Sequence, residues 1–405
     1  MSATEVAPAR RKRLLKAILA LILVSLVALA TFYSPLFQTN GVENRQIPVG
    51  TVLYEWYGFN MTSTKWTGGL GTSHWNASYI GTNGREEVYP TTIVKDEPDI
   101  GFYASDNNAT LAWQLSNMKQ AGISVIVVSW WGMGNDTTNQ NAATLDRAID
   151  NATLNVFRYV ESTRSLWNFK LAIMVEPFNY VNSTHPTFMS VTDWTNLLNY
   201  IQNTFYGPFN DITFYWQGKP LLLSYNPQVI PAVPAASVFT TRIEGNDYTL
   251  VNWVFWEGGN YNDSGTAEIG DYEYSPRISP DGEVGVAWRY DDYYLWNGTA
   301  GPGGRPGYMR FDVNGTQRLL SYEMNFTVTY RSDINFILLY SWNEYHERSA
   351  FEPHQDMNAG NFNADTRLAN WVKTLEATPD IAVGPPGART TTCTHLPHST
   401  LGQIC

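Results

Sequence analysis

Residues 335–347, with the sequence NFILLYSWNEYHE, decide the fold that this chain of 405 residues can adopt. The run has apolar side chains from its second to its sixth position, which is typical of a strand buried on both faces of a parallel sheet. It then changes to aromatic, amide and acidic side chains, among them Glu344 and Glu347. We therefore expect a buried strand over Asn335–Trp342 that ends in a group of functional side chains.

Six more apolar runs of similar length precede this one, and helix-like stretches lie between many of them. Strands that alternate with helices pair in parallel through right-handed crossovers, so the expected class is α/β. No glycine-rich phosphate loop follows the first strand, which favours a (β/α)8 TIM-type barrel over an open doubly wound sheet, with one more strand needed to close it. The further strands are expected at Val49–Tyr57, Ser124–Trp131, Lys170–Glu176, Pro220–Tyr225, Leu250–Trp256 and Val284–Tyr290, and the helices at Ala109–Ala121, Ala143–Ser162, Thr192–Phe205 and Gly315–Tyr330.

Most of these strands end in acidic or aromatic side chains. In a barrel the carboxyl ends of the strands meet on one face, where the active site is built. An acidic site lined by Trp and Tyr suits the cationic transition state of a sugar ring, although rim packing explains any single aromatic residue equally well. The strand ends concerned are Tyr54-Glu55-Trp56-Tyr57, Ser129-Trp130-Trp131, Glu176-Pro177, Tyr225-Asn226, Trp256-Glu257, Arg289-Tyr290-Asp291-Asp292 and Trp342-Asn343-Glu344.

Glu344 and Glu347 form the densest group of acids in the motif. On a continuing strand they would lie about 10 Å apart and point to opposite faces. If the chain turns helically, they become neighbours about 5–6 Å apart. Because only the second geometry brackets one glycosidic bond, we expect the chain to turn at Glu344. Like charges so placed have pKa values that move apart, which supplies a base and an acid. The alternative is a solvated pair with Arg348 as its counter-ion.

The segment Ser341–Glu347, followed by Phe351-Glu352-Pro353, resembles the Asn-Glu-Trp-His-Glu signature of glycoside hydrolase family 99, the endo-α-mannosidases and endo-α-mannanases. Weaker matches fall in the same order along the chain, and the resemblance spans about residues 50 to 353. These weaker matches are Tyr54-Glu55-Trp56-Tyr57-Gly58, Tyr103-Ala104-Ser105, Val127-Val128-Ser129-Trp130, Val175-Glu176-Pro177 and Tyr290-Asp291-Asp292.

The resemblance implies a (β/α)8 barrel that cleaves internal α-mannosidic bonds with retention and without a metal or other cofactor. It implies attack by the sugar's own 2-hydroxyl through a 1,2-anhydro intermediate. In that scheme Glu344 is the base and Glu347 is the acid that later activates water. The residues that it implies in the substrate subsites are Tyr54, Trp56, Tyr57, Trp130, Glu176, Tyr290 and His346.

Three positions leave the substrate open. Tyr345 stands where the family usually has Trp, and Arg348 begins a segment, Arg348-Ser349-Ala350, that replaces a Gly-Thr-Gln-like run. A bulky Arg348 beside the acid would narrow the cleft or contact an acidic sugar. His346 is either a contact to sugar or a hydrogen-bonded spacer between the two glutamates. The motif therefore predicts hydrolase chemistry more firmly than it predicts mannose.

The composition excludes several other classes of protein. The net charge is −11, and the strong basic run at residues 10–13 lies at the extreme N-terminus. Nucleic-acid binding needs clustered positive charge on the folded domain, so it is not expected. The six His make neither a HExxH motif nor a Cys/His zinc spacing, so no metal or cofactor is expected. The expected partner is an oligosaccharide or polysaccharide substrate.

The ends of the chain predict export. An apolar run at Ala17–Tyr33 follows the basic cluster, and it is either a type II membrane anchor or a signal peptide cleaved near Ala30. Residues 1–33 form this segment, 34–46 a linker, 47–377 the catalytic domain and 378–405 a flexible tail with Cys393 and Cys405. Ten glycosylation sequons support an extracytoplasmic location: Asn60, Asn76, Asn108, Asn135, Asn151, Asn182, Asn262, Asn297, Asn314 and Asn325.

Three hypotheses follow. The first is an exported or membrane-anchored, retaining, endo-acting glycoside hydrolase that cleaves α-mannosidic linkages. The second is a surface glycan-binding protein that has a hydrolase-like barrel without turnover. The third is a structural envelope glycoprotein, which draws on the sequons and the anchor.

Overall fold

The computed structural model describes one folded region. The chain divides into two units, residues 1–45 and 46–405, and all described residues except Arg45 belong to the second. The expected anchor or signal segment, most of the linker, the tail and the strand expected at Leu250–Trp256 lie outside the described residues. Of the described helices, none has the length and apolarity needed to cross a membrane. The described residues are 45–58, 75, 78–80, 86–88, 94–134, 140–176, 191–216, 218–224, 240–243, 268–269, 278, 282–294, 308–312 and 314–378.

The core of the fold is a curled sheet in which seven strands pair in parallel in the order β11-β14-β1-β5-β6-β8-β9. A short strand, β7 (Tyr215–Trp216), pairs with β8 in the antiparallel direction. The seven parallel strands are β1 (Val49–Tyr54), β5 (Val125–Trp130), β6 (Lys170–Val175), β8 (Lys219–Ser224), β9 (Thr240–Ile243), β11 (Glu283–Val286) and β14 (Phe336–Leu339).

These strands follow one another in the sheet in the same order as in the chain, as they do around a barrel. β1, the first strand, lies between β14 and β5, so the last strand of the sheet has returned to the first. The sequence analysis predicted six of the seven strands but not β9. The seventh predicted strand falls in the chain between β9 and β11, outside the described residues, so closure of the barrel stays a prediction.

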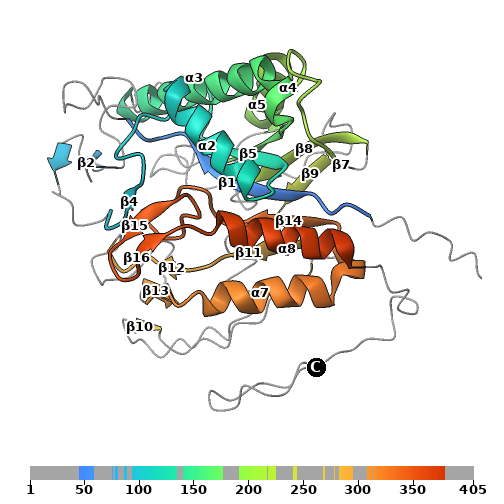
Figure 1. The fold of residues 1–405 in the computed structure, drawn as a ribbon. Helices are drawn as coiled ribbons and strands as arrows, with labels where there is room; N and C mark the ends of the chain where they lie inside the picture. The colour runs from blue at the N-terminus through green and yellow to red at the C-terminus, as the bar shows by residue number, and fades with distance from the viewer. Residues whose placement is uncertain are drawn as a thin grey trace, which may run out of the picture. The chain divides into compact units, whose positions relative to one another are not determined.

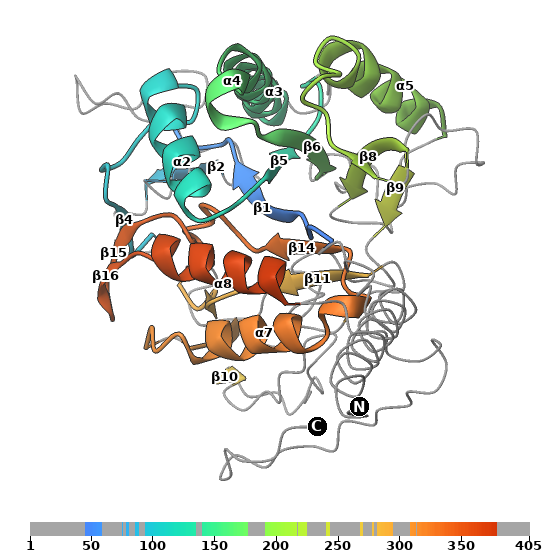
Figure 2. The ribbon, with the colours of Figure 1, turned by 45° about the vertical axis from the view of Figure 1, so that its right-hand side comes forward.

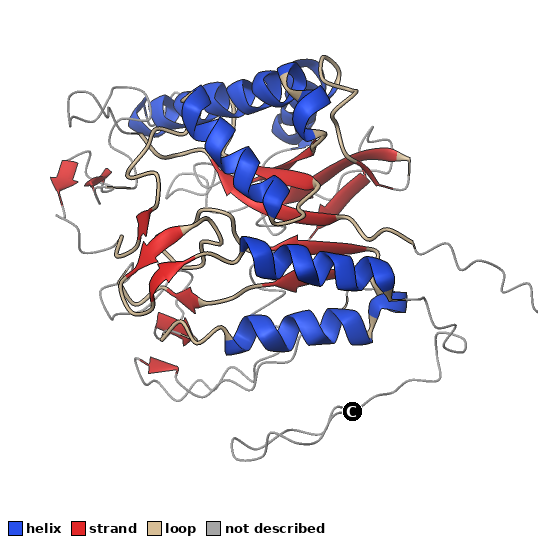
Figure 3. Ribbon diagram, viewed as in Figure 1, coloured by secondary structure: helices blue, strands red, loops and turns tan. Residues whose placement is uncertain are grey.

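Helices cover the outer face of the curled sheet. In Figures 1 and 2, α2, α3 and α5 lie along the upper part of the sheet and α7 and α8 along its lower part, and all five contribute to one apolar layer. Figure 3 shows the same arrangement by secondary structure. Four of the helices match the predicted ones, whereas α8 was not predicted. The described helices are α2 (Asn108–Gln120), α3 (Gln140–Ser162), α4 (Arg164–Trp167), α5 (Val191–Ile201) with a π-helical turn at Gln202–Tyr206, α7 (Arg318–Thr329) with a 3₁₀ turn at Arg331–Asp333, and α8 (Asp365–Ala377).

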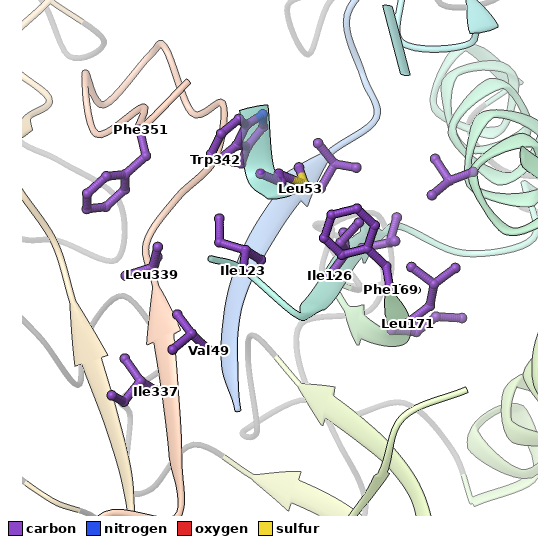
Figure 4. Close-up of a cluster of buried hydrophobic side chains, with 14 of the residues drawn as sticks. Val49, Leu53, Ile123, Ile126, Phe169, Leu171, Ile337, Leu339, Trp342 and Phe351 are labelled. Atoms are coloured by element: carbon purple, nitrogen blue, oxygen red, sulfur yellow. The ribbon is translucent and has the colours of Figure 1, made fainter. Parts of the chain in front are cut away.

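Alternation along the strands separates two apolar layers, because successive side chains of a strand point to opposite faces. Val49 and Leu53 of β1 join the layer packed under the helices, together with Ile126 of β5 (Figure 4). Val52 of β1 and Val127 of β5 join a second, separate layer on the inner face. The parity of a residue on its strand therefore decides whether it faces the helices or the interior.

Small sheets and one glycine complete the frame. Gly50 faces the inner layer, where a Cβ would lie 2.7 Å from Cζ of Phe336, so glycine leaves room for that ring. The three small sheets are β4 (Glu97–Pro98) with β15 (His354–Asp356) and β16 (Gly360–Phe362), β10 (Glu268–Ile269) with β13 (Tyr308–Phe311) and β12 (Tyr290–Asp291), and β2 (Ser78–Ile80) with β3 (Glu86–Val88).

Candidate active site

Three glutamates come together at the carboxyl ends of the strands. Glu176 directly follows β6, and its parity matches Ala172 and Met174, which belong to the inner layer. Glu344 and Glu347 lie in the loop that follows β14. The negative charge of Glu347 acts on both of the other carboxyls and contributes to their raised pKa values, so the three groups share one electrostatic site. We call Glu176, Glu344 and Glu347 the carboxyl site.

The loop after β14 turns as the sequence predicted. β14 ends at Leu339, three residues before the expected end. The backbone N–H of Ser349 donates to the carbonyl of Glu344 over 3.1 Å, and the N–H of Arg348 donates to that of Tyr345 over 3.3 Å. The Ser341 hydroxyl accepts the N–H of Glu344 over 2.8 Å. These bonds form a compact turn that brings Glu344 and Glu347 to the same place.

Glu347 is a half-buried acceptor of two phenolic hydrogen bonds. The hydroxyl of Tyr290 donates to Oε1 over 2.9 Å, and that of Tyr340 donates to Oε2 over 2.6 Å. The hydroxyl of Tyr54 in turn donates to that of Tyr340 over 3.1 Å. Donors aimed at both oxygens stabilise the carboxylate form of Glu347.

Glu344 has a different environment, with 3% of its surface exposed. Burial raises its pKa well above the usual value, and the charge of Glu347 raises it further. The backbone N–H of His346, which donates to Oε1 over 2.9 Å, opposes this rise without cancelling it. Burial and the neighbouring charge of Glu347 thus both favour the protonated form of Glu344. In a buried pair of carboxyls, like charges oppose the ionisation of both groups at once.

Glu176 keeps its proton at neutral pH. Burial raises its pKa from 4.5 to about 8, and the charge of Glu347 adds to this rise. The hydroxyl of Ser129, on the neighbouring strand β5, donates to Oε1 of Glu176 over 2.6 Å and works in the opposite direction. At neutral pH Glu176 therefore presents a neutral carboxyl group to the site.

Aromatic faces stand beside the carboxyls. Trp56 stacks on Tyr54 at 4.3 Å between ring centroids, and the ring of His346 lies nearly parallel to it at 6.2 Å. Trp131 meets Trp56 edge-on at 5.2 Å. His346 and Trp131 are both half-buried, so parts of these rings reach the solvent. Flat apolar faces next to acids are the surface that a sugar ring packs against.

One of the residues expected in the subsites faces away from the carboxyl site. Trp130 faces the helices, where its indole Nε1–H donates to Asp150 of α3 over 2.8 Å and its ring stacks on Tyr200 at 5.8 Å. Tyr57 is fully buried next to the site: its hydroxyl donates to the carbonyl of Asn343 over 2.7 Å, and the charge of Glu344 adds to the rise that burial causes in its pKa. The structure therefore brings Tyr54, Trp56, Glu176, Tyr290 and His346 to the carboxyl site, with Tyr57 buried beside Glu344 and Trp130 on the helix side.

The sequence analysis placed Ser129 and Trp131 at a strand end without assigning them to the site, and it missed Tyr340. Strand parity was the signal that could have found the first, because Ser129 shares a face with Val127 and Trp130 does not. Tyr340 directly follows β14 and shares a face with Leu338 by the same rule.

Buried polar side chains support the motif from behind. Asn343 holds the backbone of Tyr54 at both ends, accepting its N–H over 2.8 Å and donating to its carbonyl over 2.9 Å. Glu352 accepts the hydroxyls of Tyr345 and Tyr103 over 2.7 and 2.9 Å. Burial raises the pKa of Glu352 to about 7. Tyr345 is thus a buried support and does not contact the carboxyl site.

Arg348 does not take either place expected for it. Its side chain is fully buried and is bound by the carboxylates of Asp96, Asp291 and Asp356. It is therefore neither a counter-ion to the Glu344 and Glu347 carboxyls nor a group available to an acidic sugar.

A possible metal site near Arg348 also fails on charge. Asp96, His354 and Asp356 place potential ligand atoms within 4.8 Å of one another. The guanidinium groups of Arg289 and Arg348 already bind the same two carboxylates. A cation would meet two positive charges there, so these residues do not fit a metal ion.

No family model matches the chain, and no curated protein matches it. Among solved structures, the chain is similar to the GH99 endo-alpha-mannosidase from Bacteroides thetaiotaomicron, with 18% identity, a TM-score of 0.47, and coverage of 82% of this chain and 98% of that chain. The same enzyme in complex with BIS-TRIS-propane gives 17% identity, a TM-score of 0.46 and the same coverage.

A structure described as a glycoside hydrolase-like protein gives 14% identity and a TM-score of 0.45, with coverage of 84% of this chain and 96% of that chain. Identities in this range say nothing about activity. The function therefore has to be argued from this chain's own side chains.

Proposed function

We propose that this chain is a glycoside hydrolase. The observation that carries the proposal is the carboxyl site itself. Glu344, buried and with a raised pKa, lies beside Glu347, whose two oxygens accept hydrogen bonds from phenols, at the carboxyl ends of parallel strands. A paired acid and base with aromatic faces next to them is the equipment for cleaving a glycosidic bond. Sugar hydrolysis needs no other chemistry than proton transfer and stabilisation of a cationic ring.

The motif resemblance supports a finer assignment, namely a retaining, endo-acting enzyme on α-mannosidic linkages. Glu344 then takes the proton of the sugar 2-hydroxyl as the 2-oxygen bonds to C1. Glu347 protonates the leaving oxygen as its bond to C1 breaks. In the second half, Glu347 takes a proton from the water that opens the 1,2-anhydro ring, and Glu344 returns its proton to the 2-oxygen.

This scheme starts from a proton on Glu347, whereas burial and the charge of Glu347 favour a proton on Glu344 in the free protein. Substrate binding therefore has to shift a proton from Glu344 towards Glu347. Direct hydrogen bonding of the substrate 2-hydroxyl to Glu344 favours that transfer, because hydrogen bonds to a carboxylate stabilise its charged form. In this scheme the binding of the substrate brings Glu344 and Glu347 into the protonation states that catalysis needs.

The charges around the site favour a neutral glycan. The carboxyl site carries a net negative charge through Glu347, and the neighbouring guanidinium of Arg348 is turned away and saturated by carboxylates. An acidic sugar would meet repulsion there. We propose a neutral α-linked manno-oligosaccharide or polysaccharide as the substrate.

Two further parts of the proposal rest on the sequence. The order of the seven parallel strands supports closure into a (β/α)8 barrel by the strand expected at Leu250–Trp256. The basic cluster, the apolar run at Ala17–Tyr33 and the sequons support an exported protein, anchored by that run or released after cleavage near Ala30.

The test uses two substrates that differ in their need for an acid. The leaving group of a manno-oligosaccharide is a sugar hydroxyl, which departs poorly unless its oxygen is protonated. The leaving group of a disaccharyl α-fluoride is fluoride ion, which departs without a proton. Glu347→Gln should lose at least about 100-fold in kcat on the oligosaccharide and far less on the fluoride. Glu344→Gln should lose turnover on both substrates, because attack by the 2-hydroxyl precedes both departures.

Glu97→Gln, at an exposed position of β4, is the control for removing one negative charge. Wild-type turnover in both site variants would refute the proposal. If the fluoride substrate restored turnover in Glu344→Gln and not in Glu347→Gln, Glu344 would be the acid and Glu347 the base. Binding of the oligosaccharide by the wild-type chain without any cleavage would support the glycan-binding alternative.

A further inference from the structure

Five buried charged side chains lie directly behind Glu347. They are Arg289 and Arg348 with Asp96, Asp291 and Asp356, and each is at most 4% exposed. We call this group the arginine clamp. It joins four separate parts of the chain: the approach to β4, the strand β12 with the residue before it, the loop that carries Glu347, and β15. Buried charges are costly unless they are paired and hydrogen-bonded, so their contacts deserve an explanation.

Arg348 is the centre of the clamp. Its Nε and Nη2 donate to the two oxygens of Asp96, both over 3.0 Å. Its Nη1 donates to Asp291 over 2.9 Å. Arg289 donates to Asp96 over 2.6 Å and also contacts Asp356. A planar guanidinium matches such forked acceptors, and a lysine ammonium does not.

Asp96 and Arg289 of the clamp are ionised at neutral pH. Burial alone would raise the pKa of Asp96, but the two guanidinium groups outweigh burial and hold it below its usual value. Burial lowers the pKa of Arg289 to about 9, which leaves it protonated. The attraction between these charges acts in a water-poor interior, so it holds the joined segments in a fixed geometry.

The backbone of the catalytic loop is tied into the clamp next to Glu347. The N–H of Asp291 donates to the carbonyl of Glu347 over 2.7 Å. Nε of Arg289 donates to the carbonyl of Arg348 over 2.7 Å. Tyr290, whose hydroxyl binds the Glu347 carboxylate, stands between these two clamp residues. The clamp therefore controls both the peptide that carries Glu347 and a phenol that orients its side chain.

The backbone conformation of Arg348 gives a second, independent observation. Its φ is 52°, in the left-handed region, where glycine is favoured and a side chain is strained. The chain nevertheless places its longest cationic side chain at this position. A residue kept at an unfavourable φ beside a candidate acid points to a role for the side chain itself.

We propose that Arg348 is a positioning residue that sets the orientation of the Glu347 carboxyl towards the glycosidic oxygen. The inference rests on the proposed function, in which Glu347 is the proton donor. Arg348 acts through Asp291 and the loop backbone and does not touch the substrate. Displacing a catalytic group by about 1 Å costs on the order of 100-fold in rate, so small shifts of the clamp have large effects on turnover.

The test compares Arg348→Lys with Asp291→Asn, each measured per folded molecule. Arg348→Lys keeps the positive charge and loses the paired hydrogen bonds that the guanidinium donates to the two oxygens of Asp96. Asp291→Asn weakens the ion pair with Arg348 and keeps the hydrogen bond from the backbone N–H of residue 291 to the carbonyl of Glu347. This variant tests the proposal if Arg348→Lys does not fold. Both variants should lower kcat on a manno-oligosaccharide, by about 10- to 100-fold for Arg348→Lys, with KM within about twofold. On a disaccharyl α-fluoride, whose fluoride departs without a proton, the loss in the single-turnover rate of fluoride release should be within about threefold.

Arg331→Lys is the matched control, because Arg331 is also a buried arginine but binds the carbonyl of Leu375 at the end of α8, away from the site. It should lower stability and leave turnover per folded molecule unchanged on both substrates. Equal losses on the two substrates in the Arg348 and Asp291 variants, or wild-type kcat in both, would overturn the positioning role while the loss in Glu347→Gln stands. Wild-type turnover in Glu347→Gln would overturn the proposed function as well.

Discussion

Replacing Glu176 with Gln should remove a large pH dependence of stability that this buried carboxyl imposes on the protein. Glu176 is 2% exposed, and burial raises its pKa from 4.5 to about 8. The charge of Glu347 acts in the same direction, and the hydroxyl of Ser129 acts against it. Gln has nearly the same shape, keeps a group that Ser129 can bind, and never ionises.

The sign and size follow from the two pKa values. In the unfolded chain Glu176 loses its proton near pH 4.5, whereas in the folded protein it keeps the proton until about pH 8. Between these values the unfolded state binds fewer protons, so the free energy of unfolding falls by about 1.4 kcal/mol for each pH unit. The stabilising contribution is complete below pH 4.5 and is lost as pH rises towards 8. From pH 5 to pH 8 the expected loss is about 4 kcal/mol.

Urea unfolding of the wild type, Glu176→Gln and the control Glu97→Gln at pH 5, 6, 7 and 8 measures this loss directly. The free energy of unfolding of Glu176→Gln should gain about 4 kcal/mol relative to the wild type across this range. Other buried carboxyls, such as Glu55 and Glu352, are present in all three proteins and largely cancel in the comparison. Parallel pH curves for the wild type and Glu176→Gln would refute the placement of Glu176 as a buried neutral acid.

Three further predictions test the site from other directions. Ser129→Ala removes a 2.6 Å hydrogen bond that favours the ionised form of Glu176, so the pKa of Glu176 should rise further. The alkaline limb of the pH profile of kcat/KM should then move to higher pH, and an unmoved limb would contradict the role of Glu176. Tyr340→Phe removes one hydrogen-bond donor to Glu347, and a hydrogen bond to a charged group is worth about 1.5–3 kcal/mol. Steady-state kcat should therefore fall by about 10- to 150-fold, and a change below twofold would count against the hydrogen bond between Tyr340 and Glu347 as a catalytic contact. Trp130→Phe should lower the free energy of unfolding by about 1–3 kcal/mol in urea and leave kcat and KM unchanged, whereas a raised KM would return Trp130 to the substrate subsites.

Much of the fold could be predicted because its signals are local. The apolar run at residues 336–339 forms β14, and the change to polar residues after it marks the loop of the carboxyl site. The spacing of Glu344 and Glu347 predicted a turn, because an extended chain would separate two acids of one motif. β9 was missed because its four residues, Thr240–Ile243, contain only one strongly apolar side chain. Its place in the sheet is fixed by pairing with β8, which no local pattern shows.

The environment of individual side chains could be predicted less well. Trp130 and Trp131 are adjacent and identical in type, and only the register of β5 against the two apolar layers separates the one that packs under α3 from the one beside Trp56. Arg348 was expected near the substrate because its neighbour in the sequence is Glu347. Its partner Asp96 lies 252 residues away in the chain, and a contact of that kind depends on the completed fold.

The central claim is that Glu344 and Glu347 act on one sugar and leave its anomeric configuration unchanged. The most direct measurement is a proton NMR time course of an α-linked manno-oligosaccharide with the full-length wild-type chain, recorded before mutarotation. The α-anomer of the new reducing end should form first. First formation of the β-anomer, or no cleavage at all, would contradict the account.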